Sequence, residues 1–147
     1  MQNVQTKSWS NCALADLPSV AKQLISHFPK PCFFAIEGEM GAGKTTFVQE
    51  LLRVLGIEKP DGSPTYAIVH EYRSNLGMPI YHLDCYRIEN ERDLAQLGLE
   101  ELFDQTAFFF VEWPKKIEHI LPDDAKWLYI RCAPDSELRE IVLTYDN

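Results

Sequence analysis

The sequence predicts an α/β protein with a mostly parallel sheet, antiparallel additions to that sheet, and helices on both of its faces. Strand-like and helix-like patterns alternate along the chain, which is typical of this class. Residues 107–111 (AFFFV) form a fully apolar run, the composition of a central strand buried on both faces. The 147 residues suit one domain, and because no repeat or low-complexity segment divides them, we expect a single domain over residues 1–147.

The first part of the chain is expected to form two strands and two helices. Residues 4–9 alternate loosely and indicate an edge strand. Residues 17–28 carry an apolar stripe at helical spacing, with Pro18 in the first turn. A buried strand over residues 32–36 and an amphipathic helix over residues 44–55 follow.

The second part is expected to complete the sheet. Residues 66–73 and 78–86 are rich in strand formers on either side of a turn, which predicts an antiparallel hairpin. Residues 91–103 predict a helix broken near Gly98. Besides the apolar strand at 107–111, the remaining patterns predict a short helix and two late strands, at residues 115–121, 127–131 and 139–145.

A glycine-rich segment joins the second strand to the second helix. Residues 38–45 (GEMGAGKT) match the phosphate-loop pattern G-x-x-x-x-G-K-[ST] at every fixed position. Glycines let consecutive backbone N–H groups turn toward phosphate oxygens, and the helix adds its positive dipole end. Lys44 can reach the β- and γ-phosphates, and the Thr45 hydroxyl can ligate Mg²⁺. The alternative is a glycine turn before an ordinary helix.

This motif predicts a P-loop NTPase-like fold, with the loop at the carboxyl edge of the sheet. The expected cofactors are ATP and Mg²⁺. The expected phosphate-binding residues are Glu39, Met40, Gly41, Ala42, Gly43, Lys44, Thr45 and Thr46.

Two acids are candidates for completing a nucleotide site. Glu112 follows the apolar run, and a carboxylate at the end of a buried strand is costly unless it is paired or near a metal. Asp84 shares one strand face with His82 and Tyr86. We therefore predict Lys44, Asp84 and Glu112 as catalytic residues, and Thr45, Asp84 and Glu112 as metal ligands. The alternatives are an exposed acid just past the strand end for Glu112 and a solvated sheet edge for Asp84.

The sequence offers further candidate residues for the nucleotide site, each on a less specific pattern. The segment at residues 63–66 (SPTY) stands where P-loop proteins often sense the γ-phosphate, and Thr65 could reach the metal; an ordinary proline turn is the alternative. For the adenine base, the end of a late strand points to Cys132, and Asn11 could cover the other side. The candidate charge stabilisers are Arg87, Arg92 and Arg131, among which the sequence does not choose.

The composition disfavours direct nucleic-acid binding. Lys and Arg total 14 against 22 acids, so the net charge is −8, and no basic run appears.

The four cysteines form no C-x-x-C pair, which leaves zinc-knuckle and thioredoxin readings without support. The first ten residues contain no apolar signal core, so a cytoplasmic protein is expected.

Four motifs, GEMGAGKTTF, SPTYAIVHEY, YHLDCYRI and FFFVEWP, stand in the order found in a known family. In these motifs the chain resembles the bacterial TsaE (YjeE) family, the ATPase subunit of the machinery that makes threonylcarbamoyladenosine (t6A) on transfer RNA. The resemblance implies a P-loop fold, weak Mg²⁺-dependent ATP hydrolysis, action with the partners TsaB and TsaD, and contact with tRNA only through that complex. It also implies that Asp84 and Glu112 are the family's two site acids and that Trp113 supports the site or the partner surface.

Three other functions remain open at this stage. A small-molecule or nucleoside kinase would need a second substrate site and usually an arginine-rich lid, for which the chain has little room. A GTPase-like switch would need N-K-x-D and D-x-x-G motifs, neither of which is present. The third alternative is a non-enzymatic module that senses nucleotides through binding, and it overlaps with the hypothesis of a slow ATPase.

Overall fold

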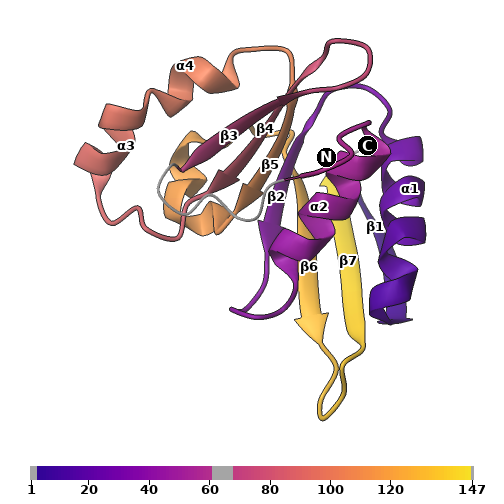
Figure 1. The fold of residues 1–147 in the computed structure, drawn as a ribbon. Coiled ribbons are helices and arrows are strands. Elements are labelled where there is room, and N and C mark those ends of the chain that lie inside the picture. Colours follow the sequence, from indigo (N-terminus) through magenta and orange to yellow (C-terminus); the bar gives the residue numbers. More distant parts are fainter. Residues whose placement is uncertain (1–2, 61–67, 147) are drawn as a thin grey trace.

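The structure is a computed structural model and describes residues 3–60 and 68–146. Its strands are β1 (Val4–Cys12), β2 (Phe33–Glu37), β3 (Val69–Arg73), β4 (Pro79–Asp84), β5 (Phe108–Glu112), β6 (Lys126–Cys132) and β7 (Arg139–Asp146) (Figure 1). Its α-helices are α1 (Leu17–His27), α2 (Lys44–Val54), α3 (Glu91–Leu97) and α4 (Leu99–Phe103). Two 3₁₀ segments, η1 (Leu14–Asp16) and η2 (Pro114–Ile120), complete the described elements.

All seven strands join one sheet in the order β1-β7-β6-β2-β5-β4-β3. The four central strands, β6, β2, β5 and β4, run parallel to one another. The outer strands β1, β7 and β3 are antiparallel to their neighbours, and β3 and β4 form the predicted hairpin. The predicted fold class, with a parallel centre and antiparallel additions, is therefore confirmed.

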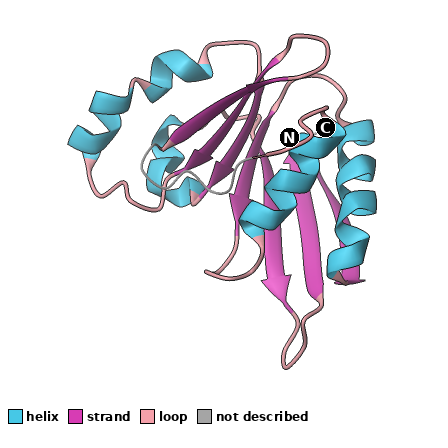
Figure 2. Ribbon diagram, in the orientation of Figure 1, coloured by secondary structure: helices cyan, strands magenta, loops and turns pink. Residues whose placement is uncertain are grey.

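Helices cover both faces of the sheet (Figure 2). Because side chains alternate along a strand, β5 sends Phe108 and Phe110 into the core beneath α1 and α2. Phe109 and Val111 point the other way, into a second core formed with residues of α3, α4 and η2. This two-sided burial explains why residues 107–111 are apolar without alternation.

Helix boundaries follow local chemistry. Gly98 adopts a left-handed backbone conformation (φ 63°) and separates α3 from α4, as the sequence predicts. The short helix expected at residues 115–121 is instead a 3₁₀ segment that begins at Pro114 and is kinked at Ile117 (φ −128°). Residues 63–66 of the SPTY motif lie outside the described residues. Over the described ranges, no helix combines the length and the apolarity that crossing a bilayer requires.

The parallel centre brings three polar residues to one edge. Strands β2, β4 and β5 end at Glu37, Asp84 and Glu112, and their carboxyl ends lie on the same side of the sheet. The glycine-rich loop leaves β2 at this edge and leads into α2 (Figure 1). The candidate site is therefore built where the topology of an α/β sheet places ligand sites.

Candidate functional site

The glycine-rich loop has the backbone conformation of a phosphate-binding loop. Gly41 and Gly43 have φ values of 81° and 99°, in the left-handed region that side chains disfavour. The loop is closed by a hydrogen bond from the Ala42 N–H to the Glu39 carbonyl (3.0 Å). Gly43 caps α2 without a side-chain acceptor, so the first N–H groups of the helix remain available for an anion.

The Lys44 side chain is held inside this loop. It is only 5% exposed, and its ammonium donates to the carbonyls of Gly38 and of Glu39 (3.0 Å for the latter). The ammonium also lies 4.1 Å from the centre of the Trp113 ring. Burial lowers the pKa of Lys44, and the nearby charge of Glu112 opposes this effect. A buried cation of this kind is stabilised further by an anionic ligand.

Glu112 is almost fully buried, at 2% exposure, beside the start of α2. Strand alternation places it on the α2 face, since it follows Phe108 and Phe110 at intervals of two. The Thr45 hydroxyl lies 2.9 and 3.0 Å from its two carboxylate oxygens, and His82 Nε2 lies 2.5 Å from Oε2. The carboxylate is therefore held next to the hydroxyl that would ligate a metal.

Asp84 stands opposite Glu112 in the register of β4 and β5. It is partly buried, and its carboxylate accepts a hydrogen bond from the Tyr86 N–H (3.0 Å). Asp84, Glu112, Thr45 and Lys44 line one cavity of about 380 Å³ with Trp113 at its rim. The structure thus brings together Lys44, Thr45 and both predicted acids.

The oxygen groups around this cavity suit Mg²⁺. A hydroxyl and two carboxylates are hard ligands, and Mg²⁺ normally takes only one or two protein carboxylates alongside phosphate and water. Within residues 3–60 and 68–146, no three or more His, Cys, Asp and Glu side chains cluster as a protein-only metal site. Two carboxylates and one hydroxyl would leave the other positions around Mg²⁺ to phosphate oxygens and water.

A second cavity, of about 250 Å³, lies on the other side of the loop. Its lining is mainly apolar, from Leu14, Leu17, Phe47, Ile130 and Ile141, with Thr46, Glu137 and Arg139 as polar members. Arg139 Nε donates to the Ala42 carbonyl (2.7 Å) and so connects β7 to the glycine-rich loop. No motif in the sequence marks Arg139 as a residue of the site.

The residues expected near an adenine base lie close to this second cavity but do not line it. Asn11 is exposed, with φ 55°, where the pairing of β1 with β7 shifts register. Cys132 is exposed at the end of β6, opposite Arg139, and lines a third cavity of about 650 Å³. Their contact with a base stays a prediction.

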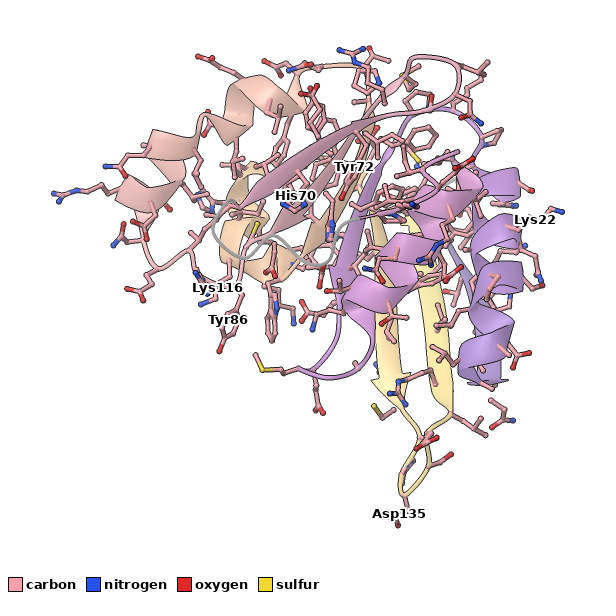
Figure 3. The ribbon with its side chains drawn as sticks, viewed as in Figure 1. Lys22, His70, Tyr72, Tyr86, Lys116 and Asp135 are labelled. Atoms are coloured by element: carbon pink, nitrogen blue, oxygen red, sulfur yellow. The ribbon has the colours of Figure 1, made fainter. Side chains whose placement is uncertain are left out.

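The candidate arginines are not at the cavity formed by Lys44 and Glu112. Arg87 and Arg92 are exposed, on the approach to α3 and within it, and Arg131 lines the third cavity. Tyr86 (Figure 3) follows the end of β4 by two residues, and its ring centre lies 5.0 Å from that of Trp113. Among the described residues, the lining of this cavity includes two aromatic residues, Tyr86 and Trp113, and no arginine.

Comparison with known proteins identifies the family. The family model for "Threonylcarbamoyl adenosine biosynthesis protein TsaE" matches residues 13–141. The chain belongs to the TsaE family. This result confirms the resemblance drawn from the four sequence motifs.

Individual TsaE relatives match over most of their length. The tRNA threonylcarbamoyladenosine biosynthesis protein TsaE of Bacillus subtilis (strain 168) is 39% identical over 137 residues, which is 92% of this chain and 84% of that protein. The protein of the same name from Treponema pallidum (strain Nichols) is 32% identical over 108 residues, 74% of this chain and 78% of that one. The crystal structure of Bacillus subtilis YdiB superposes with a TM-score of 0.78 at 33% identity, covering 100% of this chain and 90% of that one. As a TsaE family member, the chain is assigned to the biosynthesis of t6A in tRNA.

Proposed function

We propose that this chain binds ATP with Mg²⁺, hydrolyses it slowly, and serves as the ATPase subunit of t6A biosynthesis together with TsaB and TsaD. The observation that carries the proposal is the contact between the Thr45 hydroxyl and Glu112, at 2.9 and 3.0 Å, beside a loop that buries Lys44. A loop threonine next to a buried strand-end acid is the arrangement in which P-loop proteins hold Mg²⁺.

In this proposal the loop N–H groups and Lys44 bind the phosphates, which agrees with the burial of Lys44 in the first turn of α2, where no side chain caps the helix. Thr45, Glu112 and Asp84 would hold the metal directly or through water. Bound Mg²⁺ withdraws charge from the phosphate oxygens and so favours attack by water. Glu112 accepts hydrogen bonds on both oxygens, so it can hold the metal's surroundings in place.

The second cavity is the place we propose for the base and ribose. It adjoins the loop at Ala42 and Gly43 and is apolar enough for a planar base. Arg139 would then sit between the base and the loop. Asn11 and Cys132 remain proposed neighbours of the base, at the ends of β1 and β6, which flank the start of β7 on its two sides.

The partner assignment rests on family membership and on charge. A chain of net charge −8 is poorly suited to grip the tRNA backbone alone, so partner proteins would contact the RNA. We propose that the chain acts in the cytoplasm, where tRNA modification takes place, as one domain.

The direct test is ATP turnover by the purified chain with and without TsaB and TsaD, each with Mg²⁺ and with EDTA. The proposal expects slow release of ADP and phosphate that needs Mg²⁺, rises with both partners, and favours ATP over GTP. Transfer of the γ-phosphate to a small-molecule acceptor would instead favour the kinase alternative. Turnover that is insensitive to EDTA would contradict the metal assignment.

A further inference from the structure

His82 is buried directly behind Glu112. Its side chain is 0% exposed, and its Nε2 lies 2.5 Å from Glu112 Oε2. His82 does not line the cavity that Lys44, Thr45, Asp84 and Glu112 share. His82 would therefore affect a ligand in that cavity only through Glu112.

The contact constrains the orientation of the carboxylate. The Thr45 hydroxyl lies at nearly equal distances from both oxygens of Glu112, so this contact alone does not fix the plane of the carboxylate. His82 contacts only Oε2, and Nε2 must donate because a carboxylate can only accept. Because the two donors come from different elements, α2 and β4, the two contacts together fix the plane of the carboxylate. Hydrogen bonds of this type orient the carboxylates that bind metals.

Packing alone does not explain a histidine at this position. The other ring nitrogen, Nδ1, is buried and has no hydrogen-bond partner among the described residues. An unpartnered buried polar atom is unfavourable, and the neighbouring strand positions on this face, Ile80 and Phe110, are apolar. A leucine at this position would lack the hydrogen bond to Glu112, and that contact is what the histidine provides.

We propose that His82 is the positioning residue for Glu112 and sets the affinity of the nucleotide site for Mg²⁺. This inference rests on the proposed function, because it assumes that Glu112 serves a metal bound with ATP. In this inference, His82 affects the metal through Glu112 and does not contact the metal itself.

Three substitutions separate this role from a structural one. In His82→Gln the side-chain nitrogen extends about as far as Nε2 and can still donate to Glu112. In His82→Asn the nitrogen is too short to reach, and in His82→Leu it is absent. His119→Leu is the matched control, since it removes an exposed histidine that pairs with Glu91 (2.9 Å) and does not line the cavity of Lys44 and Glu112.

The measurements are affinity for a fluorescent ATP analogue as Mg²⁺ is titrated, the same affinity in EDTA, and thermal unfolding. We expect His82→Leu and His82→Asn to raise the half-saturating Mg²⁺ concentration about 10–100-fold, the usual effect of losing such a partner. His82→Gln and His119→Leu should stay within about threefold of the unchanged protein, and affinity in EDTA should change less than about twofold in every variant.

Several results would overturn the proposed role of His82. A folded His82→Leu with an unchanged Mg²⁺ requirement would overturn the inference, and so would glutamine and asparagine variants that are equally impaired. If His82→Leu does not fold, the comparison of glutamine with asparagine still decides. An unchanged protein whose affinity for the analogue is independent of Mg²⁺ would overturn the proposed function, and the inference with it.

Discussion

Replacing Glu112 with alanine probes the contact at the centre of the site. The change leaves two hydrogen-bond donors, Thr45 Oγ1 and His82 Nε2, without their acceptor. Thr45 is only partly buried and can turn to water, whereas His82 is fully buried. The stability cost should therefore come mainly from His82, about 1–3 kcal/mol for one stranded buried donor. For a chain of this size that corresponds to a fall in Tm of about 2–12 °C.

Glu112→Ala should lower the rate of ATP hydrolysis much more than it lowers the affinity for ATP. The phosphates are expected to contact the loop N–H groups and Lys44, and Lys44 donates its hydrogen bonds to the carbonyls of Gly38 and Glu39 rather than to Glu112, so affinity for ATP in EDTA should change little. Hydrolysis should fall roughly 10²–10⁴-fold, the usual range when a positioned acid or base is removed. Glu112→Gln keeps one acceptor oxygen and should lose less stability than alanine while still losing turnover.

Calorimetric titration of ATP, steady-state phosphate release and thermal unfolding, measured on both variants, check these expectations. Equal loss of metal-free binding and of hydrolysis, together with a collapse of Tm, would mean that Glu112 serves folding. Turnover at the level of the unchanged protein would refute the reasoning altogether.

Three further predictions concern other parts of the site. Lys44→Ala should abolish measurable ATP binding or turnover, because the γ-phosphate loses its nearest cation; unchanged turnover in a phosphate-release assay would remove the central assignment. At pH 8 an aromatic disulfide reagent should modify exposed Cys132 first, whereas burial raises the pKa of Cys85 to about 12 and of Cys32 to about 11, so both lack thiolate and react slowly. Bound ATP should slow labelling of Cys132 if that residue adjoins the base, and an unaltered rate would remove it from the site. Finally, the isolated chain should bind tRNA with a Kd above about 1 μM at physiological salt, and submicromolar affinity in a filter-binding assay would contradict the charge argument.

Local patterns in the sequence predict much of the fold and part of the site. The loop motif and the strand-end position of Glu112 depend on neighbouring residues only, so they can be read directly. Strand alternation puts His82 and Asp84 on one face of β4, and both lie near Glu112, whereas Tyr86 falls beyond the end of the strand.

What the sequence does not reveal depends on contacts between distant segments. That His82 meets Glu112 follows from β4 pairing in parallel with β5, a register that spacing along the chain does not encode. Arg139 reaches the loop at Ala42 because β7 folds back beside β6, and nothing in its local sequence distinguishes it from other strand residues. The sequence also gives no sign of the left-handed backbone of Trp113 (φ 57°), after which η2 begins at Pro114.

The most direct measurement is a crystal structure of this chain with a non-hydrolysable ATP analogue and Mg²⁺. The account predicts that the triphosphate lies in the loop of residues 38–45 with Lys44 on its terminal phosphates. It also predicts Thr45 on the metal, with Glu112 and Asp84 bound to it directly or through one water. A triphosphate bound elsewhere, or a metal with neither acid within reach of its water shell, would contradict it.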